Sequence, residues 1–443
     1  MRTTINHQGF KNLDGFVEKV CYFCTMLTTG YTFIFWLIIA FIIFEIILES
    51  YLDYLNDDTW NQPIPAELAG IYDDEKYAKA QQYHKALKKL GRISSVFSIL
   101  LTMSFLFMKG FTIVHLYTTM ISTNPIIQAL VFFGFFAVIS DIIGLPFELY
   151  GTFVIEEKFG FNKMTWKTYV VDKIKGYVLG AIIGGALLSA FVWFYSFAGT
   201  YFWIYVWIIF SAFTLFFTMF YTSIIVPIFN KLNPLEDGTL REQIEAFAQK
   251  VNFPLTNIFV IDGSKRSTKA NAYFSGLGSK KTIVLYDTLI KEQSDEELVS
   301  VLAHEVGHYK MKHIQTSMII GVLQMGLILF ILSIFINKPE LSQALGLQTD
   351  VPVFHLGLIA FSLLYSPISM ITGIFMNMLS RKNEFEADNY AKENVGTGEH
   401  LVSALRKLSA NNLSNLNPNK WYVFFHYSHP PLLERVRNLM MNN

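Results

Sequence analysis

Long apolar stretches alternate with polar segments along the whole chain. A helix needs about 20 mostly apolar residues to cross the hydrocarbon of a bilayer, and seven stretches meet or approach this length. They are Thr29–Glu49, Ile93–Met108, Pro125–Leu149, Gly176–Phe197, Tyr201–Phe229, Thr316–Ile336 and Val353–Leu379. The pattern predicts an α-helical polytopic membrane protein with seven transmembrane helices.

The polar segments define the expected domain organisation. A charged, helical loop is expected at 51–92, and strand-like runs occur at Asn257–Ile261 and Thr282–Tyr286. Asp141 and Pro146 lie inside the third span, so we expect this span to be broken or lined by water at that point. We expect four parts: a membrane region with spans 1–5 at 1–230, a core at 231–315, spans 6–7 at 316–379 and a tail at 380–443.

Composition narrows the class of protein further. Of the 443 residues, 52% are apolar and only 16% are charged, whereas a soluble globular chain carries about 25% charged residues. The formal net charge is zero, which argues against a nucleic-acid partner. Two cysteines exclude a disulfide scaffold.

Lysine and arginine predict the orientation in the membrane. With seven spans, the N-terminus and three loops share one side, which holds five basic residues against thirty on the other. Basic loops favour the cytoplasmic side. We therefore expect the N-terminus outside and the large polar segments in the cytoplasm, in either a bacterial inner membrane or the endoplasmic reticulum membrane.

The strongest chemical signal is the run L-A-H-E-V-G-H, with His304, Glu305 and His308. Helix positions four apart share a face, so both imidazoles can bind one Zn²⁺ with Glu305 beside them as general base. Ser294 and Glu297 form a capping-box pattern at the start of this helix. The plain alternative is a pair of surface histidines, but a capped helix just before a span favours the metal site.

A catalytic zinc takes three protein ligands, and the third is expected downstream. The run N-E-F-E-A-D places Glu384 and Asp388 on one helix face. Glu384 is predicted to bind the metal, and Asp388 to accept the outer N–H of a ligating histidine. His313 would lie half a turn out of phase on a continued helix, which excludes it as a ligand.

These parts predict hydrolysis of an amide bond with one zinc ion per chain. Zinc makes its water more acidic, and Glu305 would take the proton and pass it to the leaving amine. From a different class, a transporter could use Glu45, Asp141 and Glu148 as a proton relay, or a scaffold could carry an inactive site. The intact motif and the downstream glutamate speak against an inactive site.

Four passages resemble the type I family of integral-membrane zinc CAAX prenyl proteases. They are L-P-F-E-L-Y-G-T-F-V-I-E-E-K-F-G-F-N-K (Leu145–Lys163), D-G-S-K-R-S-T-K-A-N-A-Y-F-S-G (Asp262–Gly276), the HEVGH helix, and S-R-K-N-E-F-E-A-D with the later H-Y-S-H-P-P-L-L-E-R (His426–Arg435). The resemblance implies seven long helices around a water-filled chamber, with a gluzincin-like zinc domain on its cytoplasmic side.

The resemblance also implies a substrate and further site residues. The family removes the C-terminal tripeptide after a prenylated cysteine, so the expected partners are a prenylated or hydrophobic peptide and the bilayer. By matching motifs, His429 would contact the reacting carbonyl or oxyanion, and Asn271 with Ala272 would lie on the edge strand that pairs with substrate. Arg435 and Asp388 would support the site.

A quality-control protease of the related HtpX type is the alternative within enzymes. Such a protease would cut damaged membrane proteins. The seven expected spans and the Leu145–Lys163 passage favour the prenyl-protease type.

Overall fold

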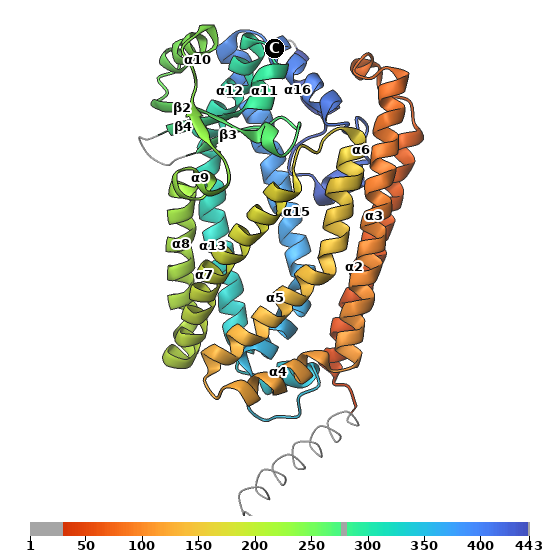
Figure 1. Cartoon of the computed structure of the whole chain (residues 1–443), viewed down its shortest axis with the longest axis vertical. Coiled ribbons are helices and arrows are strands. Elements are labelled where there is room, and N and C mark those ends of the chain that lie inside the picture. Colours follow the sequence, from red (N-terminus) through yellow and green to blue (C-terminus); the bar gives the residue numbers. More distant parts are fainter. Residues whose placement is uncertain (1–29, 276–280, 442–443) are drawn as a thin grey trace, which may run out of the picture.

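The computed structural model describes residues 30–275 and 281–441 and is mostly helical (Figure 1). The N-terminal segment up to Thr29, which the sequence places outside the membrane, and Gly276 of the resemblance lie outside the described residues. The long helices are α2 (Phe33–Asp58), α3 (Asp74–Phe107), α5 (Pro125–Tyr150), α7 (Trp166–Ala198), α8 (Phe202–Ile224), α13 (His313–Phe335) and α15 (Phe354–Val395).

Shorter helices connect the long ones or form one end of the molecule, which we call the head and which comprises residues 231–315 and 380–441. They are α4 (Gly110–Ile121), α6 (Glu157–Phe159), α9 (Val226–Phe229), α10 (Thr239–Lys250), α11 (Asp287–Glu292), α12 (Asp295–Lys310), α14 (Pro339–Ala344), α16 (Glu399–Asn411), α17 (Lys420–His426) and α18 (Leu432–Met440). Figure 1 shows α10, α12 and α16 at one end of the molecule and α4 at the opposite end.

Six segments of the described residues are long and apolar enough to cross a membrane. They are Phe33–Asn61, Asp74–Phe107, Pro125–Phe159, Trp166–Phe229, His313–Phe335 and Phe354–Val395. The fourth contains both α7 and α8, two helices that the sequence analysis treats as separate spans. The polytopic helical class is confirmed, whereas the count of seven spans stays a prediction.

The second expected span is part of a longer helix. Ile93–Met108 forms the apolar half of α3, which begins at Asp74 and continues without a break from the charged half. The Asp73 side chain caps this helix by accepting a hydrogen bond from the backbone N–H of Lys76 at 2.7 Å. Most of the expected loop 51–92 is therefore helix that extends from α2 and α3.

A break of the third span at Pro146 is contradicted, whereas a lining of water at this point stays a prediction. Helix α5 passes through Pro146 and continues to Tyr150, and a π-helical turn follows at Gly151–Glu156. Asp141 has a partner on the neighbouring helix, because Lys173 Nζ of α7 lies 2.7 Å from its carboxylate. Such pairing is how acidic groups are accommodated in spans.

A small sheet lies in the head beside α12 (Figure 1). Its strands are β1 (Leu232–Pro234), β2 (Leu255–Ile261), β3 (Ala272–Ser275) and β4 (Lys281–Tyr286), in the order β1-β2-β4-β3. Strands β2 and β4 are parallel and the other pairs are antiparallel. The two strand-like runs seen in the sequence lie within β2 and β4, and β3 forms one edge.

Buried apolar side chains gather in two main clusters. One cluster fills the head, where Leu298 and Val306 of α12 pack with Ile283 of the sheet. The other lies among the long helices and includes Phe132 and Leu356. The head cluster fixes α12, the helix that carries the HEVGH run.

Candidate metal centre

Helix α12 begins at the predicted capping box. The Ser294 side chain accepts a hydrogen bond from the backbone N–H of Glu297 at 3.3 Å, and the Glu297 carboxylate accepts one from the backbone N–H of Ser294 at 2.8 Å. These bonds satisfy donors that the first turn leaves free. The start of the helix, and with it the position of His304 and His308 about three and four turns further on, is therefore fixed locally.

Helices α12 and α15 approach each other closely at Gly307. A Cβ atom at this position would lie 3.1 Å from the Cα of Ala387 and 3.1 Å from the Cβ of Tyr390. Only glycine therefore allows this contact without movement of the two helices. The contact brings Glu384 of α15 opposite the two histidines of α12.

Three ligand-type groups face one another between these helices. The Nε2 atoms of His304 and His308 lie 3.1 Å apart. One carboxylate oxygen of Glu384 lies 3.2 Å from His308 Nε2, and the other lies 3.4 Å from His304 Nε2. All three ligand atoms lie within 4.8 Å of one another. The structure thus brings together the three residues that the sequence predicts as metal ligands.

One oxygen of Glu384 fits a bound cation. Glu384 is 4% exposed, and its Oε2 atom makes only long contacts, at 3.4 Å, to His304 Nε2 and to a guanidinium nitrogen of Arg435. A buried carboxylate oxygen with such long contacts is incompletely satisfied, and a cation would complete them. The two nitrogens and the carboxylate match the donor set of a catalytic metal site with three protein ligands.

Asp388 and Arg435 support the first histidine. The Asp388 carboxylate lies 2.8 Å from His304 Nδ1 and is fully buried. Arg435 donates two hydrogen bonds to Asp388, at 2.6 and 2.9 Å, and lies 3.4 Å from Glu384 Oε2. With its Nδ1–H committed to Asp388, His304 presents the lone pair of Nε2 to the site.

The carboxylates around His304 make the site attract positive charge. Burial disfavours the charged imidazole, but the hydrogen bonds to Asp388 and Glu384 outweigh this cost and raise the pKa of His304 to about 9. A metal ion that binds there takes the place of this proton.

A second pair of side chains, which the sequence analysis did not assign, supports His308. His308 Nδ1 lies 3.1 Å from His313 Nδ1, and His313 Nε2 lies 2.9 Å from a carboxylate oxygen of Glu386. If His313 donates to Glu386, its Nδ1 accepts the N–H of His308, whose Nε2 lone pair then faces Glu384. His313 thus lies beside His308 but is not one of the three residues whose ligand-type atoms form the group; its exclusion as a ligand stays a prediction.

His429 lies at the edge of the same site. Its Nε2 atom lies 3.4 Å from Glu384 Oε1, and its side chain is 65% exposed. Arg381 of α15 holds the preceding segment by donating hydrogen bonds to the backbone carbonyls of Val423 and Tyr427. His429 is thus held next to the ligand cluster with most of its surface open.

The remaining predicted residues lie on α12 and at the sheet edge. Glu305 is partly buried on α12 between the two histidines. Asn271 precedes the edge strand β3, and its side chain accepts a hydrogen bond from the backbone N–H of Ala272 at 2.9 Å. Ala272 pairs with Leu285 on β4, which leaves the other side of β3 unpaired within the described sheet.

Comparison with known proteins identifies the family. A family model described as "CAAX prenyl protease N-terminal, five membrane helices" matches residues 57–231, and one described as "Peptidase family M48" matches residues 234–442. Together with the helical fold and the His-His-Glu cluster, these matches define a polytopic membrane metalloprotease.

The relatives narrow this class. The CAAX prenyl protease 1 homolog of Oryza sativa is 38% identical over 411 residues, which cover 91% of this chain and 96% of that protein. CAAX prenyl protease 1 of Saccharomyces cerevisiae is 33% identical over 91% of this chain and 94% of its own. The crystal structure of S. mikatae Ste24p matches with a TM-score of 0.87 at 33% identity, covering 93% of this chain and 100% of that one. The chain belongs to the CAAX prenyl protease 1 family.

Proposed function

We propose that this protein is a zinc endopeptidase that hydrolyses the peptide bond after a prenylated cysteine and so removes the C-terminal tripeptide of CAAX proteins. The observation that carries the proposal is the convergence of His304, His308 and Glu384 in a chain whose relatives are named CAAX prenyl proteases. Those names favour this substrate over the damaged membrane proteins cut by HtpX-type proteases.

The residues present can hold one zinc ion per chain and carry out the proton transfers. A zinc ion held by the two histidines and Glu384 would act as a Lewis acid on the carbonyl of the scissile bond. Glu305 would take a proton from the attacking water as the C–O bond forms, and would give a proton to the leaving nitrogen as the C–N bond breaks.

Two further groups would position the substrate. His429, beside Glu384 and largely open, can donate a hydrogen bond to the developing oxyanion. The unpaired edge of β3 can take up an extended peptide as an additional strand, with Asn271 and Ala272 at its start. Asp388 and Arg435 would keep His304 in the orientation that binds the metal.

We also propose the location of these parts. Residues 1–230 and 316–379 would form the membrane region, whereas 231–315 and 380–443 would form the catalytic head on the cytoplasmic side. The excess of lysine and arginine in the head supports this orientation. The membrane would be a bacterial inner membrane or that of the endoplasmic reticulum.

Cleavage of a farnesylated CAAX peptide by the protein purified in detergent tests the proposal. The wild type should release the tripeptide and contain one zinc ion per chain. Glu305→Gln should keep the zinc but lose about 100-fold or more in rate, because it cannot take up the proton. The same peptide without the farnesyl group is the matched substrate control.

The outcomes separate the parts of the proposal. Equal cleavage of both peptides would contradict the prenyl requirement and favour general membrane proteolysis. Zinc without cleavage would contradict the substrate, and a protein that neither binds zinc nor cleaves would overturn the enzymatic proposal.

A further inference from the structure

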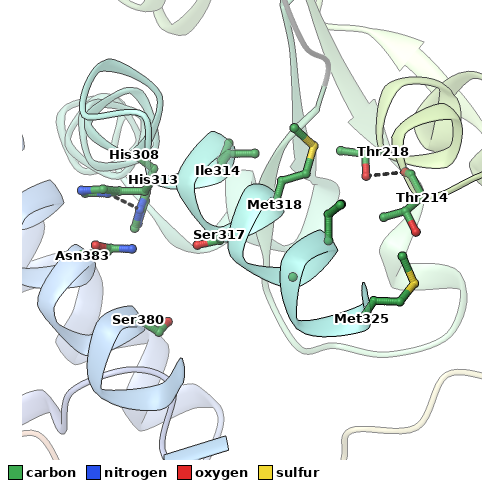
Figure 2. Close-up of a pocket in the computed structure, with 12 residues that line it drawn as sticks. Thr214, Thr218, His308, His313, Ile314, Ser317, Met318, Met325, Ser380 and Asn383 are labelled. Atoms are coloured by element: carbon green, nitrogen blue, oxygen red, sulfur yellow. Dashed lines mark hydrogen bonds between the residues drawn. The ribbon is translucent and has the colours of Figure 1, made fainter. Parts of the chain in front are cut away.

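A pocket of about 610 Å³ leads away from the metal centre along α13. Figure 2 shows its lining: His308 and Asn383 lie at one end, and Met325 of α13 lies at the other. Helix α13 runs between α15 on one side and α8 on the other (Figure 2). Because His308 is both a lining residue and a ligand-type residue, the pocket borders the candidate metal centre.

The α13 side of the pocket is one apolar helix face. Ile314, Met318, Val322 and Met325 follow each other at intervals of three or four residues and all line the pocket. At a rise of 1.5 Å per residue, this face is about 16 Å long. The pocket is therefore elongated, and apolar side chains of α13 follow it from Ile314 to Met325.

The α8 side offers few free polar groups. Thr214 and Thr218 line the pocket, but each hydroxyl donates a hydrogen bond to a backbone carbonyl of its own helix at 2.8 Å. Among the described residues that line this pocket there is no Asp, Glu, Lys or Arg. A second pocket among the long helices, of about 670 Å³, contains Glu45 and Glu49, so it is less suited to a hydrocarbon chain.

We propose that the pocket along α13 binds the isoprenoid chain of the substrate's prenylated cysteine. The inference rests on the proposed function, in which the scissile bond directly follows the lipidated residue. The isoprenoid is therefore attached one residue from the cleaved bond, so its binding site must begin next to the metal centre. The pocket begins at His308, has an apolar row of side chains along α13, and has no acidic side chain, lysine or arginine in its described lining. It is similar in length to an extended farnesyl chain and has the volume of a small-molecule site.

Gly321 provides a direct way to fill this pocket. It lies on the same face of α13 and lines the pocket, and a Cβ atom there would meet no other atom within 4 Å. A larger side chain at this position would therefore occupy the pocket about two thirds of the way from Ile314 to Met325. Gly184 of α7 is a matched control, since it is also in a long apolar helix with open space at its Cβ position.

The test compares cleavage of peptides that carry geranyl, farnesyl or geranylgeranyl groups. Gly321→Phe should lower kcat/KM about tenfold or more for the two longer chains, because several buried methylene groups lose their place. For the geranyl peptide, kcat/KM should change by less than about threefold, because this shorter chain ends before it reaches the added ring. Gly184→Phe should leave all three unchanged, and zinc content should be equal in all proteins.

A second measurement does not depend on the bulky variant. The Glu305→Gln protein is illuminated with a farnesylated peptide whose isoprenoid ends in a diazirine, and the labelled residues are mapped by mass spectrometry. Labels are expected between 314 and 325 of α13. Labelling confined to α2, or a loss in Gly321→Phe that is equal for all chain lengths, would overturn the pocket assignment. Failure of the wild type on every prenylated peptide would instead overturn the proposed function itself.

Discussion

At the scale of single residues, the candidate metal centre is surrounded by side chains that contact the two histidines and are not themselves among the three ligand-type residues. Glu386 accepts from His313, which in turn contacts His308. Glu386→Ala should weaken zinc binding about 10- to 100-fold, because His308 loses the partners that fix its ring and its tautomer. The measurement is the zinc dissociation constant by competition with a chelator, with activity restored at saturating zinc.

Lys382 provides the control for this prediction. Its ammonium lies 3.6 Å from the Glu386 carboxylate, but its side chain is 71% exposed, and exposed ion pairs contribute little. Lys382→Ala should therefore leave zinc affinity within about twofold of the wild type. An equal loss in both variants would mean that Glu386 acts through surface charge rather than through His313.

The spacing of the sequence predicted His304, His308, Glu384 and Asp388, because each pair lies four residues apart on one helix. The sequence did not indicate the contact of His313 with His308. The exclusion of His313 assumed that α12 continues, whereas α12 ends at Lys310 and Lys312 adopts a left-handed conformation before α13 begins. The chain thereby turns, and His313 returns to the site.

At the scale of elements, the contact between α12 and α15 determines whether the ligands meet. Gly307→Ala places a Cβ 3.1 Å from the backbone of Ala387, so the helices must separate by a few tenths of an ångström. We expect a loss of about 1–3 kcal/mol in stability together with weaker zinc binding. Thermal unfolding and zinc titration in detergent measure both effects.

Gly91 of α3 is the control for Gly307. A Cβ atom there meets nothing within 4 Å, so Gly91→Ala should be neutral or stabilise by about 0.5–1 kcal/mol through reduced backbone freedom. If Gly307→Ala behaved like this control, the close approach of the two helices would not limit the geometry of the site.

The head also contains a pH-dependent set of polar contacts between α12 and α16. Glu297 accepts hydrogen bonds from Ser403 and Lys407, each at 2.6 Å. Burial opposes its charge, but Lys407, Ser403 and the Ser294 backbone outweigh burial and hold the pKa below its usual 4.5. The folded state therefore binds the proton more weakly than the unfolded chain, so this stabilisation is present above pH 4.5 and is lost as the pH falls through the lowered pKa.

Glu297→Gln tests the contribution of these polar contacts to stability. At pH 7 the free energy of unfolding of the variant should be about 2 kcal/mol lower than that of the wild type, because hydrogen bonds to a charged group are replaced by neutral ones. The variant should therefore melt at a lower temperature. The difference should shrink as the pH falls below 4.5. A difference that stays constant over this range would show that the charge of Glu297 is not responsible.

The sequence predicts those helices and strands whose apolar residues form a continuous run within one segment. The apolar spans and the strands β2 and β4 follow from runs within single segments. Three features did not follow: the continuity of α3 from Asp74, the passage of α5 through Pro146, and the short helix α4 at Gly110–Ile121. For α5, a contact that is distant in sequence accompanies this passage: Asp141 pairs with Lys173 of α7.

At the scale of the whole molecule, the two ends of the helical bundle differ in the number of lysines and arginines that they carry. The head, with α10 and α16, lies at one end, and α4 lies at the other (Figure 1). Under the proposed topology, only five of the 35 lysines and arginines lie on the side opposite the head. Because basic loops stay in the cytoplasm, we expect the metal centre to face the cytoplasm and the α4 end to face outward.

Single-cysteine labelling of spheroplasts of a bacterial expression host tests this orientation. Cys21 and Cys24 are first replaced by serine, and a cysteine is then introduced either as Thr123→Cys, after α4, or as Asp237→Cys, before α10. Both positions are exposed, so the side chains themselves do not limit the reaction. A membrane-impermeant maleimide should label Thr123→Cys in intact spheroplasts, and Asp237→Cys only after lysis. The reverse pattern would place the metal centre outside and would contradict cleavage of cytoplasmic prenylated proteins, because their C-termini could not reach it.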